Sequence, residues 1–229
     1  MFEILNIDNM NFVFDKKADL IFCDPIYESL DFSWIDKYWD LLKDTGIFCV
    51  LTDFHSSAEI KMYLSAMPKA HFLNWLVWKN EFGNFRKDRF RQCHDDIIIF
   101  YKGDSYKFYP ERVQVPKVTA SSKGYNPSGR LTKLATSVIT DICLNTGAKE
   151  RVIKDDGHLI RWQKPVKLLD RIISPFVDSG EIVLDPFMGS GSLAEWCLEN
   201  SMGYIGMELD KEVFNLANKR INNIKEGMK

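Results

Sequence analysis

The stretch EIVLDPFMGSGSLA, residues 181–194, is the part of the chain that decides the fold. An apolar run ends at Asp185, glycines follow at positions 189 and 191, and an amphipathic stretch begins at Ser192. Glycines let the backbone approach a ligand closely, and the first turn of a helix favours negative charge. The stretch therefore predicts a buried strand, a ligand-binding turn and a helix at the edge of a sheet.

An acidic residue, Glu208, ends the next apolar run, 17 residues after Gly191, where it could bind both hydroxyls of a ribose. The pattern Gly189-x-Gly191-x-x-Ala194 also matches a dinucleotide fingerprint, so NAD is an alternative ligand, and a tight turn without a ligand is another. However, residues 185–188 (Asp-Pro-Phe-Met) separate the strand from the first glycine. An acid and bulky side chains there would repel and crowd a pyrophosphate, and they favour a ribose-bearing cofactor without phosphate, such as S-adenosylmethionine.

Apolar runs and amphipathic stretches alternate on both sides of this turn, which predicts an α/β fold with a mostly parallel sheet covered on both faces. Strands are predicted at residues 19–23, 47–51, 71–78, 96–101, 182–184 and 203–207. Helices are predicted at residues 33–43, 56–67, 165–176, 192–200 and 210–224. Residues 102–157 are rich in Ser, Thr, Gly, Pro and Lys and show little periodicity, and a long segment of this kind is usually functional.

The composition of the 229 residues, 45% hydrophobic and 27% charged, is that of one large globular domain, with or without a small insertion. No apolar run approaches the length of a membrane span, and the first 15 residues lack the basic head of a signal peptide. The five cysteines are an odd number and form no Cys-x-x-Cys pair, which predicts reduced thiols and no metal site. We therefore expect a cytoplasmic protein.

The net charge of −2 conceals a basic region. Residues 79–133 contain 12 Lys and Arg against 6 Asp and Glu, and residues 112–140 contain five basic residues and no acidic one. A basic stretch in an otherwise acidic protein indicates either a localised contact with a polyanion or a solvated loop, and charge alone does not separate the two.

A second strand-to-loop corner, Asp24-Pro25-Ile26-Tyr27, follows another buried apolar run. A carboxylate at the edge of a sheet can accept a hydrogen bond from an amino group, and an aromatic ring three residues later can stack on a planar base. Two such corners in one sheet would place a cofactor and a planar amine side by side.

Together these motifs resemble those of the amino-group DNA methyltransferases of the β group, over nearly the whole chain. The matching segments are Asp24–Tyr27 for the catalytic D-P-P-Y, His94–Lys102 for H-E-x-I-x-x-F-x-K, Gln163–Pro165 for Q-K-P, Asp185–Ser192 for D-P-F-x-G-S-G-T, Gly206–Asp210 for G-x-E-x-D and, more weakly, Asn6–Asp8 for an N-terminal cofactor contact. Two departures are Ile26 in place of the second proline and Ser192 in place of threonine.

The resemblance implies a Rossmann-like methyltransferase fold with a mostly parallel seven-stranded sheet, helices on both faces and a circularly permuted motif order. It divides the chain into a catalytic half at residues 1–102, an inserted target-recognition region at residues 103–157 and a cofactor-binding half at residues 158–229.

The activity that the resemblance implies is methyl transfer from S-adenosylmethionine to the exocyclic amino group of a flipped adenine in double-stranded DNA. The amino group of cytosine, an RNA or a protein glutamine remain alternative substrates, and a DNA-binding module without turnover is an alternative of another class. A homodimer, a cognate restriction endonuclease and a bacterial or phage-infected host cell are further expectations from the resemblance.

The same resemblance assigns roles to individual residues. Asp24 and the Pro25 carbonyl would accept the two amine hydrogens, and Tyr27 would stack on the base, while Cys23 is expected in the core and not as a nucleophile. The expected cofactor-binding residues are Asp8, Gln163, Lys164, Asp185, Phe187, Gly189, Ser190, Gly191 and Glu208. Lys164 would pair with the methionine carboxylate of the cofactor, with a solvated lysine at the helix start as the alternative.

Basic residues interleaved with aromatic ones are the expected contacts to DNA. These residues are Arg86, Lys87, Arg89, Arg91, Lys117, Lys123 and Arg130. Phe85 or Phe90 would insert into the duplex, although phenylalanines that pack on the sheet are the alternative.

Overall fold

The structure is a computed structural model that describes residues 1–25, 31–80, 87–117, 129–144, 152–153, 157 and 163–228. Four residues with an expected role, Tyr27, Phe85, Arg86 and Lys123, lie outside these ranges. In the described ranges, no helix is long and apolar enough to cross a membrane, and no group of three or more His, Cys, Asp or Glu side chains is arranged to hold a metal ion.

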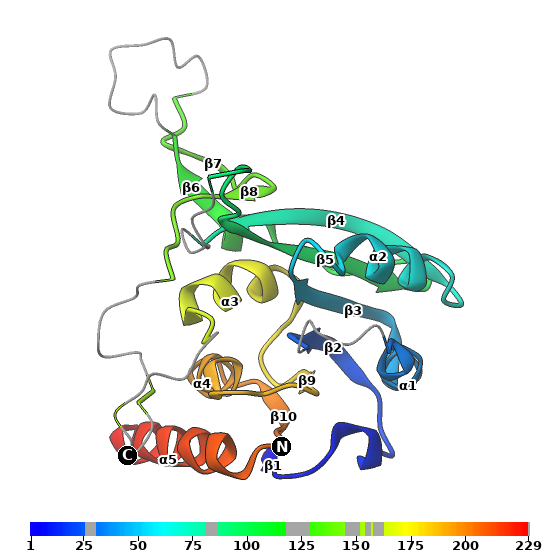
Figure 1. Ribbon diagram of the computed structural model, residues 1–229, viewed down its shortest axis with the longest axis vertical. Helices are drawn as coiled ribbons and strands as arrows, with labels where there is room; N and C mark the ends of the chain where they lie inside the picture. The colour runs from blue at the N-terminus through cyan, green and yellow to red at the C-terminus, as the bar shows by residue number, and fades with distance from the viewer. Residues whose placement is uncertain are drawn as a thin grey trace.

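One large sheet organises the molecule (Figure 1), and within the described residues it has eight strands in the order β1-β10-β9-β2-β3-β5-β4-β8. The bounds of the strands are Phe2–Leu5 (β1), Ala18–Cys23 (β2), Leu42–Thr52 (β3), Ala70–Lys79 (β4), His94–Lys102 (β5), Val138–Ile139 (β8), Ile182–Asp185 (β9) and Gly203–Met207 (β10). The strands from β1 to β3 in this order are parallel, whereas β5 is antiparallel to both β3 and β4. The mixed α/β fold expected from the sequence is confirmed.

The expected count of seven strands is wrong, because β8 joins the edge of the sheet parallel to β4. Three side chains anchor this short strand. The indole N–H of Trp78 donates to the Ile142 carbonyl oxygen at 2.8 Å, and Ile139 and Ile142 are both buried. The pairing is too short to leave a period in the sequence, so burial of two isoleucines, and not strand propensity, accounts for it.

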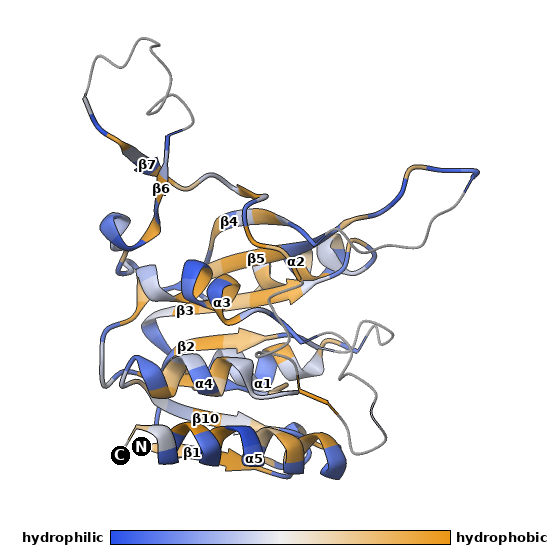
Figure 2. Cartoon of the chain, turned by 90° about the vertical axis from the view of Figure 1, so that its left-hand side faces the viewer, coloured by the Kyte–Doolittle hydropathy of each residue, from blue (hydrophilic) through white to orange (hydrophobic). Residues whose placement is uncertain are grey.

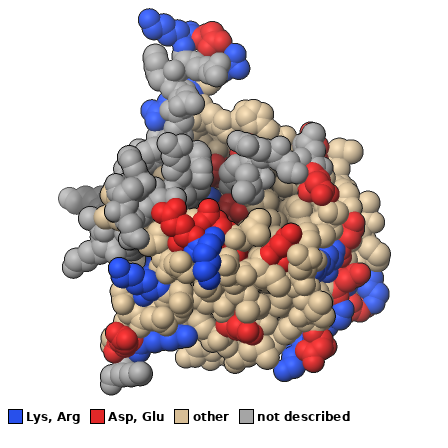
Figure 3. Space-filling view, turned by 60° about the horizontal axis from the view of Figure 1, so that its bottom comes forward, with Lys and Arg blue, Asp and Glu red and all other residues tan. Residues whose placement is uncertain are grey.

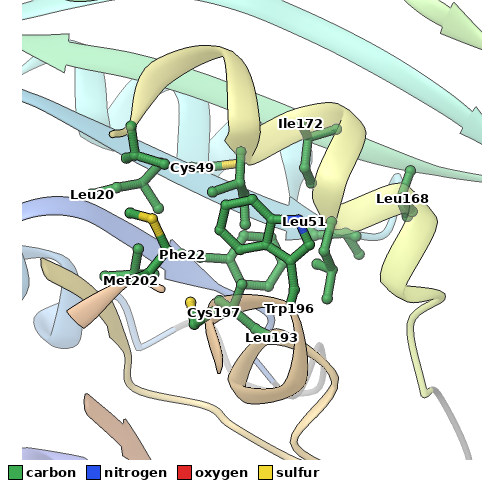
Figure 4. Packing of buried hydrophobic residues seen from close by; sticks show 14 of the residues in the cluster. Leu20, Phe22, Cys49, Leu51, Leu168, Ile172, Leu193, Trp196, Cys197 and Met202 are labelled. Carbon is green, nitrogen blue, oxygen red and sulfur yellow. The ribbon is translucent and has the colours of Figure 1, made fainter. Parts of the chain in front are cut away.

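The helices cover both faces of the sheet, as Figure 1 shows, with α1 and α2 on one face and α3, α4 and α5 on the other. Their bounds are Ser33–Leu41 (α1), Ser57–Ser65 (α2), Val166–Ile173 (α3), Ser192–Glu199 (α4) and Lys211–Gly227 (α5). Because side chains of a strand alternate between faces, Leu20 and Phe22 of β2 pack against α3 and α4 (Figure 4), whereas Ile21 and Cys23 pack against the α1 side. Cys23 is fully buried, as expected.

Several element boundaries shift by a few residues from the sequence prediction, and one helix end and one strand show the physical causes. The helix predicted at residues 33–43 ends at Leu41, and Lys43 lies instead in β3, where its ammonium group is 2.7 Å from a carboxylate oxygen of Asp19. The strand β1 was not predicted, since its four residues include Glu3 and give no alternating pattern. This segment forms a strand because it pairs with β10, and not because of a pattern in its own residues.

The region predicted to lack regular structure, residues 102–157, contains more order than expected. A 3-10 helix at Pro110–Val113 leads into a two-stranded hairpin of β6 (Gln114–Pro116) and β7 (Thr132–Leu134), which stands away from the main sheet (Figures 1 and 2). Arg112 fixes the base of this hairpin by donating to the Val177 carbonyl at 2.6 Å and to Asp178 at 3.0 Å. Arg112, one of the basic residues of this region, is therefore engaged in contacts within the protein.

Candidate active site

The site lies where β2 and β9 meet. These strands are parallel neighbours, with Leu20 opposite Val183 and Ile21 opposite Leu184, so their carboxyl ends emerge at the same edge of the sheet. Asp185 is the last residue of β9, and Asp24 directly follows β2. The structure thus brings together two Asp-Pro corners that are about 160 positions apart in the chain.

A cavity of about 560 Å³ opens at this edge. Of the residues expected to bind the cofactor or the amine, the cavity is lined by Asp8, Asp24, Pro25, Gln163, Lys164, Asp185, Phe187, Gly189, Ser190 and Glu208. Gly191 stands behind this lining as the N-cap of α4 with φ of 76°, and a Cβ atom there would lie 3.3 Å from that of Ala217. Glycine is therefore required at 191 for the backbone conformation and for the approach of α5.

The charge of the cavity is one-sided. Its described lining includes six acidic residues, Asp8, Asp24, Asp31, Asp185, Glu208 and Asp210, and one basic residue, Lys164. Such a site repels a pyrophosphate, which disfavours the dinucleotide alternative, and it attracts a ligand with positive charge. The positively charged sulfonium and ammonium groups of S-adenosylmethionine fit this negative charge.

Asp185 is the most deeply buried acid of the site, with 2% of its surface exposed. It accepts hydrogen bonds from the Tyr204 hydroxyl at 2.9 Å and from the Phe187 backbone N–H at 3.3 Å. Burial nevertheless raises the pKa of Asp185 to about 7, and the negative charges of Asp24 and Glu208 add to the shift. A cationic ligand would lower this pKa again by stabilising the carboxylate.

Glu208 links the glycine turn to the strand that precedes α5. Its carboxylate accepts the Gly189 backbone N–H at 3.0 Å and the Asp210 backbone N–H at 2.7 Å, and burial raises its pKa. Each carboxylate oxygen can accept a second hydrogen bond, so the two hydroxyls of a ribose can still bind here.

The N-terminal segment closes the cavity from a third side. Asn6 donates to the Glu208 carbonyl oxygen at 2.8 Å, and Asn9 donates to the Pro186 carbonyl oxygen at 3.1 Å. Asp8 caps the 3-10 helix Asn9–Asn11 by accepting the Met10 N–H. The sequence indicated Asp8 only weakly and gave no indication of the clamping role of Asn6 and Asn9, because single asparagines in a loop carry no pattern.

Lys164 pairs with Asp24, a contact that the sequence did not predict. Its ammonium nitrogen lies 2.8 Å and 3.0 Å from the two carboxylate oxygens of Asp24, and only 6% of the lysine side chain is exposed. A third carboxyl group, that of Asp95 on β5, lies near the pair, and burial raises its pKa while Lys164 lowers it. Lys164 thus acts within the structure as the counter-ion of the expected catalytic acid.

The residues expected to contact DNA fall into two groups. The segment that links β4 to β5 leaves the sheet at this same edge, because β4 runs in the same direction as β3 and β2. Lys87, Arg89, Phe90 and Arg91 form one exposed run, in which Arg89 pairs with Asp88 at 2.9 Å. Lys117 and Arg130 lie beside the β6–β7 hairpin, where the Lys117 backbone N–H donates to the Leu131 carbonyl at 2.9 Å. On the face shown in Figure 3, acidic and basic side chains are interspersed.

The sequence profile of the amino-group (N6 and N4) DNA methylases matches residues 18–219, and the chain belongs to this family. It is 28% identical to the type II methyltransferase M1.MboII of Moraxella bovis, over 91% of this chain and 85% of that protein. It is 26% identical to the type II methyltransferase M.HpaI of Haemophilus parainfluenzae, over 91% of this chain and 69% of that protein. The crystal structure of an M1.HpyAVI–SAM complex shares the fold, with a TM-score of 0.73 and 24% identity over 97% of this chain and 100% of that one.

Family membership confirms the resemblance inferred from the motifs and identifies the methyl donor as S-adenosylmethionine. The donor supplies an activated methyl group on a positively charged sulfur. The observations that fit it to this chain are the acidic cavity and the Glu208 carboxylate beside the glycine turn.

The raised pKa of Asp185 predicts a specific pH dependence of stability in the cofactor-free protein. The folded state binds the Asp185 proton more tightly than the unfolded state, so this group stabilises the fold most below about pH 4 and progressively less up to about pH 7. The free energy of unfolding of Asp185→Asn, measured by urea denaturation, should therefore decrease less between pH 4.5 and pH 7 than that of the wild type.

Asp178→Asn is the control for this measurement, because its ion pairs and hydrogen bonds lower the pKa of Asp178 to about 2 and confine its effect to more acidic solutions. Identical curves for wild type and Asp185→Asn between pH 4.5 and pH 7 would contradict the assignment.

The pairing of Lys164 with Asp24 predicts how a charge deletion would affect turnover. Lys164→Met leaves the largely buried carboxylate of Asp24 without this cation, so methyl transfer should fall at least about tenfold. Lys164→Arg should retain more activity. The affinity for S-adenosylhomocysteine relative to 5′-methylthioadenosine, which lacks the amino-acid tail, should be unchanged. A loss of that preference would assign Lys164 to the cofactor carboxylate instead.

Proposed function

We propose that this protein methylates the exocyclic amino group of adenine in double-stranded DNA. The observation that supports the proposal most is that Asp24 and the cofactor candidates Asp185 and Glu208 line one cavity. The parallel pairing of β2 with β9 brings Asp24 and Asp185 to the same edge of the sheet. An amine held at Asp24 would lie beside the methyl donor, which turns a reaction between two molecules into one between positioned groups.

Asp24 would orient the amine. The lone pair of an aromatic amine is delocalised into the ring, which makes the nitrogen a poor nucleophile. If Asp24 and the Pro25 carbonyl oxygen each accept one amine hydrogen, the nitrogen moves toward tetrahedral geometry and its lone pair points at the methyl group. Asp24 can keep Lys164 as a partner meanwhile, since a carboxylate offers about four acceptor positions. After transfer, the nitrogen loses a proton, for which Asp24 is the nearest base of this set.

The base must leave the duplex to reach this cavity. Extrusion costs a few kcal/mol of stacking and pairing, and stacking on an aromatic side chain offsets part of this cost. Tyr27, three residues after Asp24, is our candidate for that ring.

No covalent intermediate is part of the proposal. Cys23 precedes Asp24, but its side chain is fully buried on the α1 face of the sheet. Burial and the neighbouring carboxylates raise the pKa of its thiol well above the usual value, so a thiolate does not form near neutral pH. This property disfavours methylation of a ring carbon, which needs a nucleophilic cysteine.

The choice of adenine over cytosine rests on the family resemblance of the first catalytic residue. Among the proteins that this chain resembles, Asp at this position accompanies adenine more often and Ser accompanies cytosine. Asp24 and the Pro25 carbonyl would hold the amino group of either base in the same way. Cytosine is therefore the alternative that the experiment must test.

For the contacts to DNA, we propose two basic segments, whose described members are exposed except for the half-buried Lys117. Lys87, Arg89 and Arg91 form one and Lys117 and Arg130 the other, with Arg86 and Lys123 as further members outside the described residues. Phe90, whose side chain is fully exposed, is available to insert between bases. A homodimer and a cognate restriction endonuclease remain proposals, prompted by the type II methyltransferases among the relatives.

Analysis of methylated nucleosides tests the proposed base. Unmethylated bacterial genomic DNA is incubated with the protein and S-adenosylmethionine, digested to nucleosides and examined by mass spectrometry. We expect amino-methylated adenine, because Asp24 stands at the first catalytic position. The detection of amino-methylated cytosine alone would contradict the choice of base, and methylation of RNA alone would contradict the choice of nucleic acid.

The exposed basic run predicts a salt dependence. If Lys87 and Arg89 contact phosphates, Lys87→Glu/Arg89→Glu should lower the slope of log affinity against log salt by about 0.9 for each lost contact. The matched control is Lys16→Glu, since Lys16 is also exposed but precedes β2 and so lies at the opposite edge of the sheet. An unchanged slope in the double variant would exclude this segment from the DNA interface.

A further inference from the structure

One wall of the active-site cavity contains a buried polar group that the proposed mechanism does not use. Thr52 is the last residue of β3 and lines the cavity with Asp24 and Pro25. In the parallel pairing of β2 with β3, Cys23 stands opposite Val50. Two residues further on, Thr52 therefore lies at the level of Pro25, on the strand next to the catalytic corner.

The Thr52 hydroxyl has no hydrogen-bond partner within the described structure, although the residue is completely buried. Asp96 is its cross-strand neighbour in the antiparallel pairing with β5, yet the hydroxyl does not bond to that carboxylate. Most buried polar side chains in proteins are hydrogen-bonded, and leaving one unpaired is costly. A hydroxyl that is unpaired and lines a ligand cavity is the expected state of a group whose partner is the ligand.

The surroundings of Thr52 indicate which part of the ligand it meets. Thr52 shares a strand face with Phe48 and Val50, which pack on the α1 and α2 side. Beside it, the cavity is lined by Phe32, Ser56 and the buried side chain of Ile60. In the sheet, β3 lies on one side of β2, and β9 and β10 lie on the other. Asp185 ends β9 and Glu208 follows β10, so Thr52 and these cofactor candidates lie on opposite sides of Asp24. A wall with apolar side chains and the hydroxyls of Thr52 and Ser56, of which that of Thr52 has no partner in the described structure, suits the edge of a planar base.

We propose that Thr52 is a base-binding residue whose hydroxyl donates a hydrogen bond to the ring nitrogen adjacent to the target amino group. This inference rests on the proposed function, because it takes the ligand to be a flipped base with its amine at Asp24. Three hydrogen bonds then hold one edge of the base. Asp24 and the Pro25 carbonyl accept from the amine, and Thr52 donates to the neighbouring nitrogen. The ring could no longer pivot about the amine, so the lone pair stays aligned with the methyl group.

Thr52→Val tests this role, because valine keeps the shape and removes only the hydroxyl. Three measurements are made on the full chain. The urea midpoint should be unchanged or higher, since no internal hydrogen bond is lost and an unpaired buried group is removed. The affinity for S-adenosylhomocysteine, measured by calorimetry, should be within twofold of wild type. The kcat/KM for methylation of unmethylated genomic DNA should fall roughly three- to thirtyfold.

Thr52→Ser, which restores the hydroxyl, should recover most of the lost kcat/KM. A lower urea midpoint for Thr52→Val would overturn the proposal, because it would reveal an internal partner such as Asp96. Weaker binding of S-adenosylhomocysteine would assign the hydroxyl to the cofactor, and an unchanged kcat/KM would exclude a contact with the base. Failure of the proposed function is distinguishable, since it appears as the absence of methylated DNA with the wild-type protein itself.

Discussion

The parallel pairing of β2 with β9 is the constraint on which the active site depends. Only two residue pairs define it, Leu20 with Val183 and Ile21 with Leu184, and all four side chains are fully buried. Their burial on both faces of the sheet holds the strands in one register, because a slip by one residue would exchange the faces that contact α1 and α4. The catalytic corner and the glycine turn are distant in sequence, and this register determines how far apart their acids stand. The N-terminal segment and β3 then complete the cavity from the flanking strands.

The convergence of these strand ends also gives the cavity its excess of negative charge. Among the described residues, several acids share one cavity with a single lysine, so the free protein carries unfavourable charge that burial of Asp185 makes more costly. Lys164 relieves part of it by pairing with Asp24. A positively charged donor relieves more, so we infer that affinity for the cofactor and the charge state of Asp185 are coupled. The same acids explain why a glycine turn that formally resembles a dinucleotide fingerprint is unsuited to a pyrophosphate.

The sequence was sufficient to predict the α/β class, the main strands and helices, and the convergence of Asp24, Asp185 and Glu208, because long apolar runs and strand-end motifs are local patterns. It missed β1 and β8, whose order comes from pairing and burial and not from their own residues. It could not show that Lys164 faces Asp24, since a contact across 140 positions leaves no trace in spacing. The Thr52 hydroxyl was missed for the same reason, although the rule that strand ends line the site applies to β3 as well as to β2.

The central claim is that Asp24 orients the target amine and does not hold the cofactor. Calorimetric titration of S-adenosylhomocysteine into Asp24→Asn, with methyl transfer to DNA measured on the same preparation, tests this claim most directly. The account predicts an affinity within a few-fold of wild type together with loss of methyl transfer, because the glycine turn, Asp185 and Glu208 are intact in the variant. Loss of affinity in a variant that remains folded, or methyl transfer that persists without the carboxylate, would contradict it.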